Sequence, residues 1–406
     1  MGIVEIRGLT YSYPNAKAPA LDGVDLTIER GEFVLLTGPS GCGKTTFCRC
    51  LNGLIPHFYG GDLNGDIRVA GLDTRESPTY RLAQHAGLVF QNPDNQIFAL
   101  TVEKDVAFGL ENLGVEKAKM LEGVDWALEK AGISHLRDRA THELSGGQKQ
   151  RLAIASILAM RPEVLVLDEP TSFLDPLGAE RIFQVLESLN KEHGITILLI
   201  EHRLDLAAQH VDRVVIFSEG KIVGNGSPEE IFALEETRLA GVGIPKIVQL
   251  YKRLRSEGFP LERPPLTPEA LVEELGKWLP PEGQQATAKP TSPEIEGFDW
   301  ERHASPAVEV QGVSFSYPSG VKALDGVSLT IHRGEFVAIM GENGAGKTTL
   351  VKHFNGLLRP SAGWIKVDGG DISGLSVANL SRRVGLVFQN PDDQLFSESV
   401  EEEIGF

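Results

Sequence analysis

Two glycine-rich segments of this sequence have the residue types that bind a phosphate chain. They read GPSGCGKT and GENGAGKT, and both fit the P-loop pattern of glycine, four residues, glycine, lysine and a hydroxyl residue. Glycines let successive backbone N–H groups face the phosphates, the lysine adds a positive charge, and the threonine hydroxyl can bind Mg²⁺. We therefore predict two nucleotide sites. Their residues are Gly38, Pro39, Ser40, Gly41, Cys42, Gly43, Lys44, Thr45 and Thr46 in the first segment, and Gly341, Glu342, Asn343, Gly344, Ala345, Gly346, Lys347, Thr348 and Thr349 in the second, with Thr45 and Thr348 as metal ligands.

Two acidic residues that follow an apolar run are candidates for metal binding and catalysis. The run from Val164 to Leu167 is typical of a buried strand, and Asp168 and Glu169 come immediately after it. A carboxylate delivered beside a P-loop can bind Mg²⁺, and a second one can polarise the attacking water. We predict Asp168 as a metal ligand and Glu169 as the catalytic base. The alternative is an acid pair that only ends a strand in solvent or caps a helix.

A third segment, LSGGQ, has the features of a separate anion-binding helix terminus. Serine is a common helix cap, and two glycines after it leave backbone N–H groups accessible. An uninterrupted helical pattern then runs from Lys149 to Met160. We predict a phosphate contact by a signature segment that consists of Ser145, Gly146, Gly147 and Gln148. The alternative is an ordinary capped helix.

These residues require a scaffold in which strands alternate with helices. Short β-branched runs occur at 32–37, 164–167, 195–200 and 214–217, each followed by a turn or a helical pattern. Such runs are typical of a largely parallel sheet that is buried on both faces. We therefore predict an α/β domain of the P-loop type, with a strand, loop and helix at each P-loop.

The chain contains two copies of one domain. The string ALDGV begins at Ala20 and again at Ala323, and LVFQNPD begins at Leu88 and again at Leu386. We predict a complete domain at 1–235, a helical extension at 236–279, a flexible linker at 280–305 and a truncated second copy at 306–406. Because the second copy stops early, neither P-loop has a complete site within the chain, and we expect the chain to be part of a longer protein.

Composition excludes several classes of protein. The chain has 406 residues, with 39 Lys and Arg against 56 Asp and Glu, a net charge of −17. This acidic balance argues against a broad nucleic-acid surface, which needs clustered cations. No apolar stretch approaches the roughly 20 residues of a membrane-spanning helix, and no secretory signal is visible. The three cysteines are predicted to be reduced thiols, because their spacing suits neither a disulfide nor a metal.

Together these motifs resemble the nucleotide-binding subunits of ATP-binding-cassette (ABC) transporters, over nearly all of 1–235 and 306–406. The resemblance implies two tandem cassettes with helical subdomains, which bind ATP and Mg²⁺ and hydrolyse ATP between the P-loop of one cassette and the signature segment of another. It implies that Tyr13 and Tyr317 stack on adenine, and that His202 contacts the γ-phosphate. Gln91 and Gln389 match the Q-loop glutamine, a metal contact, and Gln91 is also assigned to catalysis. The segment 172–175 matches the D-loop, with Phe173 where alanine is common.

Finer details resemble the energy-coupling-factor and cobalt-type importers. The relevant strings are FQNPDNQ, FQNPDDQ and EHRLD. This resemblance implies a peripheral ATPase at the cytoplasmic face of the cell membrane. Its expected partners are a transmembrane coupling protein and a small membrane protein that captures a vitamin or a transition metal ion. Cassettes are expected to dimerise, within the full chain or between chains. The alternative is a soluble twin-cassette ATPase that acts on ribosomes or nucleic acid.

Overall fold

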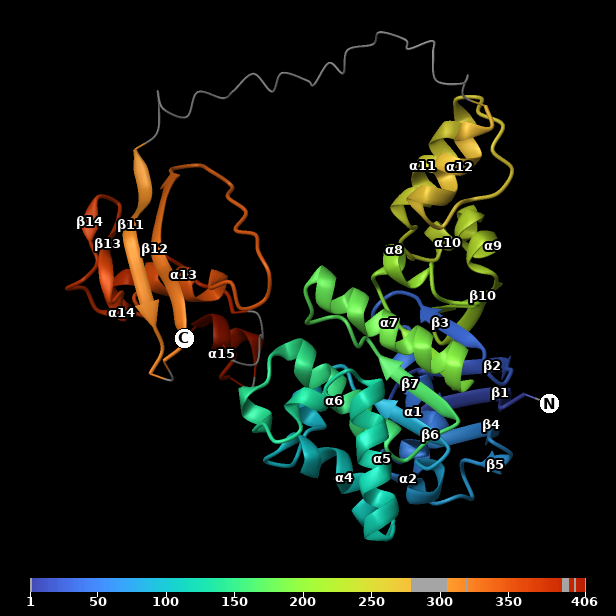
Figure 1. Ribbon diagram of the computed structural model, residues 1–406. Helices are drawn as coiled ribbons and strands as arrows, with labels where there is room; N and C mark the ends of the chain where they lie inside the picture. Colours follow the sequence, from blue (N-terminus) through green and yellow to red (C-terminus); the bar gives the residue numbers. More distant parts are fainter. Residues whose placement is uncertain (1, 279–304, 319, 389–393, 398, 406) are drawn as a thin grey trace. The chain divides into compact units, whose positions relative to one another are not determined.

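The structure is a computed structural model with two compact units, Met1–Gln284 and Gln285–Phe406 (Figure 1). It describes residues 2–278, 305–318, 320–388, 394–397 and 399–405. The predicted linker at 280–305 lies outside the described residues except for Ser305.

The first unit is built on the predicted, largely parallel sheet. Its strands, in spatial order, are β10 (Lys221–Gly226), β9 (Arg213–Ser218), β3 (Phe33–Thr37), β8 (Thr196–Ile200), β7 (Val164–Asp168) and β6 (Ala86–Val89). Only β10 pairs antiparallel. Every residue of β3, β7 and β8 is buried, as expected for strands covered on both faces. The carboxyl ends of these strands therefore meet at one edge of the sheet.

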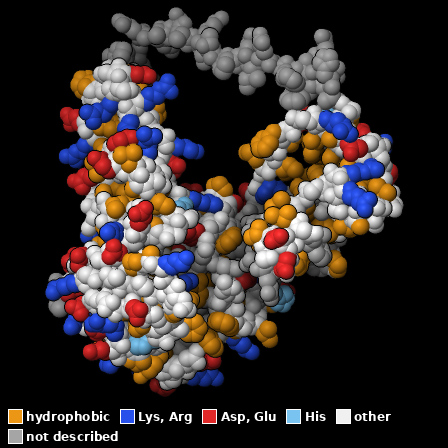
Figure 2. Space-filling view, turned by 180° about the vertical axis from the view of Figure 1, so that it is seen from behind, with side chains coloured by type: hydrophobic (Ala, Val, Ile, Leu, Met, Phe, Trp, Pro, Cys, Tyr) orange, Lys and Arg blue, Asp and Glu red, His pale blue; other side chains and the backbone are white. Residues whose placement is uncertain are grey.

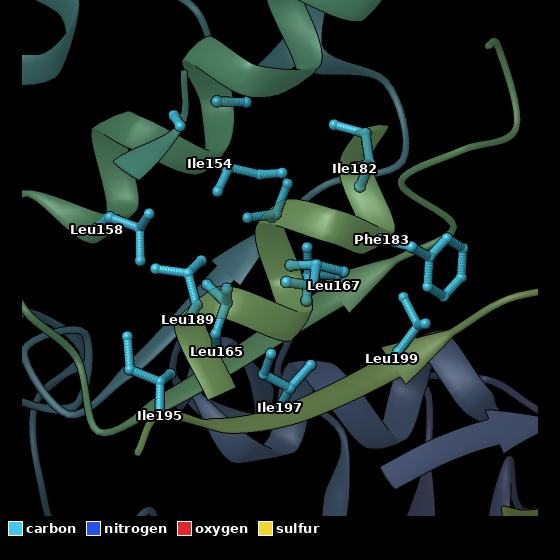
Figure 3. Packing of buried hydrophobic residues seen from close by; sticks show 14 of the residues in the cluster. Ile154, Leu158, Leu165, Leu167, Ile182, Phe183, Leu189, Ile195, Ile197 and Leu199 are labelled. Carbon is cyan, nitrogen blue, oxygen red and sulfur yellow. The ribbon is translucent and has the colours of Figure 1, made fainter. Parts of the chain in front are cut away.

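Helices and turns connect these strands. They are α1 (Lys44–Leu51), α2 (Leu54–His57), α3 (Thr79–Leu82), η1 (Pro93–Asn95), α4 (Val102–Asn112), α5 (Lys117–Lys130), η2 (Ser134–Leu136), η3 (Thr141–Glu143), α6 (Gly146–Leu158), α7 (Pro176–His193) and α8 (Leu204–Ala207). Figure 3 shows side chains of α6 and α7 packed against β7 and β8. Each such fully buried aliphatic side chain stabilises the fold by about 1.5–3 kcal/mol. The signature helix α6 is thus joined firmly to the strand that ends in Asp168.

The other face of the parallel sheet is covered by α1 and by an antiparallel sheet that the sequence reading did not predict. This second sheet has the order β2 (Leu21–Ile28), β1 (Val4–Ser12), β4 (Asp62–Val69) and β5 (Leu72–Asp73). Between them lies a core that contains Phe47 and Leu51 of α1. The three cysteines are free and buried here, as predicted for reduced thiols, and burial raises the pKa of Cys50 to about 12.

Short helices follow the last strand of the first unit. They are α9 (Pro228–Ala233), α10 (Glu235–Leu239), α11 (Lys246–Ser256) and α12 (Pro268–Gly276). Ser227 and Glu230 form a capping box at α9, and the Thr267 side chain caps α12. Tyr251, Leu261 and Leu271 form a small core between α11 and α12. The segment predicted as a helical extension thus contains α11 and α12.

The second unit repeats the antiparallel sheet. Its strands have the order β12 (Lys322–His332), β11 (Pro306–Ser316), β13 (Ala362–Val367) and β14 (Gly370–Asp371), and its helices are α13 (Lys347–Phe354), α14 (Val377–Leu380) and α15 (Val400–Gly405). Leu350 and Phe354 of α13 pack against this sheet.

The strand predicted before the second P-loop is not formed, and that prediction was wrong. Residues 335–341 have no regular structure, and Phe336 and Met340 are exposed. In the first unit β3 pairs with β8 and β9, and no strand among the described residues of the second unit corresponds to either. An apolar segment without strand neighbours cannot satisfy its backbone groups in a sheet. Hydrophobic side chains are accordingly visible on the surface of this unit in Figure 2.

Candidate functional site

The first P-loop connects the end of β3 to the start of α1. The Nζ atom of Lys44 donates to the carbonyl oxygens of Gly38 at 2.8 Å and Pro39 at 2.9 Å, so the ammonium lies inside the curve of the loop. Gly43 has a φ of 107°, and a Cβ atom there would lie 2.5 Å from the carbonyl oxygen of Ala20. Glycine is therefore required at this position. The loop presents a cation and a helix N-terminus together, as a phosphate site requires.

The predicted adenine platforms are attached to the P-loop helices in the same way in both units. The Tyr13 hydroxyl is 3.1 Å from the Thr46 hydroxyl, and the Tyr317 hydroxyl is 3.0 Å from the Thr349 hydroxyl. Tyr13 also accepts a hydrogen bond from Arg49 at 3.4 Å. These contacts hold each ring beside its P-loop, and stacking on adenine remains a prediction.

Asp168 lies at the end of β7, beside the P-loop. Its residue is only 8% exposed, and its carboxylate is hydrogen-bonded to the Thr45 side chain. Burial raises the pKa of Asp168, although Thr45, Arg49 and Lys44 act in the opposite direction. The structure thus brings together the predicted carboxylate and hydroxyl ligands. Both offer the hard oxygen atoms that Mg²⁺ prefers.

Asp168 should make the unfolding free energy depend on pH. Its pKa is raised in the folded state, so the folded protein loses stability as the pH rises from the unfolded pKa through the folded one. We expect Asp168→Asn to unfold at a higher temperature than the parent protein at pH 8 without Mg²⁺. The difference should shrink towards about pH 4, where the unfolded carboxyl protonates. Melting curves at both pH values test this, and an equal difference at both would contradict it.

The three predicted catalytic residues meet at Glu169. Its carboxylate accepts a hydrogen bond from the Gln91 side-chain amide at 2.7 Å, and its other oxygen lies 2.9 Å from Nε2 of His202. Glu169 has a φ of 48°, an unusual value for a residue with a side chain. The backbone N–H of Glu169 donates to the carbonyl oxygen of Ile200. One carboxylate is therefore fixed between an amide and an imidazole at the strand edge that carries Asp168, and the predicted contact of Gln91 with Mg²⁺ remains a prediction.

Glu201 is a buried acid beside the predicted catalytic residues, and the sequence analysis assigned no role to it. It follows β8 as Asp168 ends β7, it is 1% exposed, and its carboxylate accepts from the backbone N–H groups of His202 at 2.8 Å and Arg203 at 3.1 Å. The Thr171 hydroxyl also donates to it. The signal in the sequence that could have identified Glu201 is an acidic residue directly after a buried strand. Glu201 thus holds the backbone of His202, whose side chain contacts Glu169.

Glu201→Ala should lower both stability and turnover. The loss leaves buried donors without a partner, so we expect the unfolding free energy to fall by about 1–3 kcal/mol. Turnover should fall more than the ATP affinity, because His202 is misplaced while the P-loop is untouched. Urea unfolding and steady-state hydrolysis measure both effects. The exposed Glu192 on α7 gives the control Glu192→Ala, and equal turnover in the two variants would contradict the assignment.

The signature segment forms the exposed start of α6. The Ser145 hydroxyl accepts from the Gln148 backbone N–H at 3.4 Å, and the Gln148 side chain accepts from the Ser145 N–H at 2.9 Å. This capping box shows the serine cap expected at the start of the helix, Ser145 and Gly146 are exposed, and the phosphate contact of the signature segment remains a prediction. A ligand from solvent can therefore reach this helix end.

The second P-loop has the same local conformation as the first. Lys347 donates to the carbonyl oxygens of Gly341 and Glu342, both at 2.7 Å. Gly341, Gly344 and Gly346 have positive φ angles, as Gly38, Gly41 and Gly43 do. Thr348 is exposed at the start of α13. The other predicted metal contact of this site, Gln389, lies outside the described residues.

Comparison with known sequences finds one family. The ABC transporter family pattern matches residues 21–172 and 324–403. A protein of Methanosarcina acetivorans with the provisional name ABC transporter ATP-binding protein is 43% identical over 99% of this chain and 66% of its own length. A Methanosarcina mazei protein of the same name is 42% identical over 100% of this chain and 69% of its own length. A Pyrococcus abyssi protein, also so named, is 47% identical over 69% of this chain and 100% of its own length. The chain thus spans about two thirds of the length of the two Methanosarcina relatives.

Solved structures show the same fold. The cbiO1 protein of Clostridium perfringens, described as part of the ABC transporter complex cbiONQ, has a TM-score of 0.54 and 37% identity over 62% of this chain and 99% of its own. A nucleotide-free ATP-binding cassette from an ABC transporter has a TM-score of 0.52 and 27% identity over 60% of this chain and 100% of its own.

Proposed function

Because this chain belongs to the ABC transporter family of ATP-binding proteins, we propose that it is the ATP-hydrolysing subunit of an importer of the energy-coupling-factor type. The observation that carries the hydrolytic part is the Glu169 carboxylate, held by Gln91 and His202 at the strand edge beside Asp168. The importer type rests on the strings quoted above and on the likeness to cbiO1. A vitamin or a transition metal ion is the proposed cargo.

The proposed reaction is attack of water on the terminal phosphorus of ATP. Glu169 accepts a proton from the water as its oxygen bonds to that phosphorus, and the bond from the phosphorus to the bridging oxygen of ADP breaks. ADP leaves with the electron pair of that bond, and inorganic phosphate is the second product. Lys44 holds the phosphates, while Gln91 and His202 keep the carboxylate aimed at the water.

Asp168 and Thr45 are the residues that would hold Mg²⁺. Their buried carboxylate and neighbouring hydroxyl fit this ion, because both ligands are oxygen atoms and burial leaves the carboxylate poorly solvated. When bound, Mg²⁺ neutralises charge that develops on the phosphates.

The apolar groove of the first unit supports a membrane-protein partner. We define it by Tyr80, Phe98, Phe108, Leu113 and Met160, which line a cavity of about 400 Å³. Tyr80, Phe98 and Phe108 are exposed. Exposed aromatic residues around a concavity are typical of interfaces. We propose that the transmembrane coupling protein docks here, with the small capture protein bound to it in turn.

The proposed location is the cytoplasmic face of the cell membrane, with attachment through the partner. Within the described ranges 2–278 and 305–405 with their gaps, no helix combines the length and the apolar character that a bilayer crossing demands.

A paired purification tests the proposed partner. The parent protein and Phe98→Asp are purified from mild-detergent extracts of native membranes, and co-purifying proteins are identified by mass spectrometry. We expect a multispanning membrane protein with the parent, and at least about tenfold less of it with the variant. Val223→Asp, at an exposed apolar position on β10, is the matched control. Ribosomal proteins instead of a membrane protein would favour the ribosome-associated class of ATPase.

A further inference from the structure

A buried carboxylate outside the catalytic site joins the groove to the signature helix. Asp105 lies on α4 and is 4% exposed. Its Oδ1 atom accepts from the backbone N–H groups of Phe98 at 2.9 Å and Ala99 at 3.0 Å. Its Oδ2 atom accepts from the Ser156 hydroxyl of α6 at 2.8 Å. Hydrogen bonds to an ionised acceptor are among the stronger ones in proteins. A single side chain therefore connects three segments of the first unit.

The second unit contains the same carboxylate contact. Glu403 corresponds to Asp105, because both lie seventeen residues after the start of LVFQNPD, at Leu386 and at Leu88. It accepts from the N–H groups of Phe396 at 2.9 Å and Ser397 at 2.8 Å. The bonds to two consecutive backbone amides thus occur in both copies, with an aspartate in one and a glutamate in the other. Asp105 also accepts a hydrogen bond from the signature helix α6, and among the described residues Glu403 has no such bond.

The segment that Asp105 holds is part of the groove wall. Phe98 is 72% exposed and lines the groove. The same stretch is tied to α6 a second time, because Lys149, the residue after the signature segment, donates to Asp94 at 2.6 Å. Gln91, three residues before Asp94, contacts Glu169. The stretch from 91 to 99 is therefore bonded to the catalytic carboxylate at its start and to the signature helix through Asp94 and Asp105.

We propose that Asp105 is a positioning residue that fixes the groove wall at Phe98 and Ala99 to the signature helix α6, so that the wall and the signature segment move together when ATP is bound. This inference rests on the proposed function, because it assigns the groove to a partner and the signature segment to ATP held by another cassette. The inference adds Asp105 as the residue through which a displacement of the groove wall is passed to the signature segment.

Two substitutions distinguish the transmission of a displacement by Asp105 from simple support of the fold, and a third is their control. Asp105→Ala removes both the amide bonds and the bond to α6. Ser156→Ala removes only the bond to α6 and leaves the amide bonds to Asp105 in place. Asp105→Glu introduces the residue that the second unit uses for the same contact, and it serves as the conservative variant that should retain the behaviour of the parent.

Hydrogen–deuterium exchange on the full chain carrying Glu169→Gln measures the coupling, with and without ATP and Mg²⁺. In this parent we expect ATP to change exchange in both 96–101 and 145–152. In Asp105→Ala we expect at least about tenfold faster exchange of the Phe98 and Ala99 amides and loss of the ATP response at 96–101. In Ser156→Ala these amides should stay protected while the ATP response at 96–101 falls at least twofold. Asp105→Glu should restore both properties.

Two results would overturn the inference while leaving the proposed function in place. One is an ATP response at 96–101 that survives unchanged in Asp105→Ala and Ser156→Ala. The other is a parent in which ATP affects 145–152 but never 96–101. If ATP changes neither segment in the parent, the expected contact between ATP and the signature segment of another cassette fails, and the inference fails with it. Measurement of nucleotide binding in the same preparations, and of hydrolysis in matching proteins that keep Glu169, distinguishes that case from the first two.

Discussion

Glu169→Gln should lower the rate of ATP hydrolysis by about 10²–10⁴-fold, the usual contribution of a positioned general base, while ATP still binds. Glutamine keeps the shape of the side chain and can still accept from Gln91, but it cannot take a proton from water. In the parent protein Glu169 contacts Nε2 of His202 at 2.9 Å. We expect the glutamine to keep this contact as a hydrogen bond to an uncharged amide. Phosphate release under saturating ATP measures the turnover, and equilibrium binding of a fluorescent ATP analogue measures the affinity.

The control is Glu192→Gln on the exposed side of α7, which carries the same chemical change away from the site. Turnover of Glu169→Gln within a few-fold of that control would remove Glu169 from the role of base. Gln91 and His202 would then be holding a carboxylate that the reaction does not use.

Lys44→Ala should lower the ATP affinity of the first P-loop by about 10- to 100-fold, because a hydrogen bond to a charged group contributes about 1.5–3 kcal/mol. Hydrolysis should be lost as well, since Asp168, which is hydrogen-bonded to Thr45 of this P-loop, and the neighbouring Glu169 belong to the same predicted site. Lys347→Ala is the matched variant, because Lys347 makes the same two contacts in the second P-loop. It should weaken ATP binding at its own loop and leave most of the hydrolysis by the first site.

Titration of both variants with the fluorescent analogue, followed by phosphate release, measures these effects. Equal loss of hydrolysis in the two variants would contradict the assignment of the catalytic role to the first P-loop.

Local motifs were sufficient to predict which residues of the first site lie together. The P-loop, the acids after β7 and His202 each sit in a short pattern whose position along the chain indicates the end of a parallel strand. Because parallel strands align their carboxyl ends, residues as distant in sequence as Gln91, Glu169 and His202 could be expected to meet, and they do.

Features that depend on distant partners were missed or mispredicted. The segment before the second P-loop reads like β3 but forms no strand, because strand formation requires neighbours that the described part of the second unit lacks. The antiparallel sheet was missed because β1 contains register shifts between Ile6 and Tyr11 that interrupt a simple alternation. Glu201 and Asp105 are buried acids whose roles follow from hydrogen bonds across the fold, which local patterns do not contain.

The central claim is that a P-loop acts on ATP together with the signature segment of another cassette. Mixing two inactive variants tests it directly. Lys44→Ala has an intact signature segment, and Gly147→Asp has an intact P-loop but a negative charge at the phosphate-binding end of α6. A Cβ atom at Gly147 would only touch Leu174, at 3.7 Å, so the variant can fold. We expect each variant to be inactive alone, and an equimolar mixture to recover roughly a quarter of the parent hydrolysis, because half of the dimers are mixed and each contains one intact site. A mixture that stays inactive, or a Gly147→Asp variant that hydrolyses ATP normally, would contradict the account.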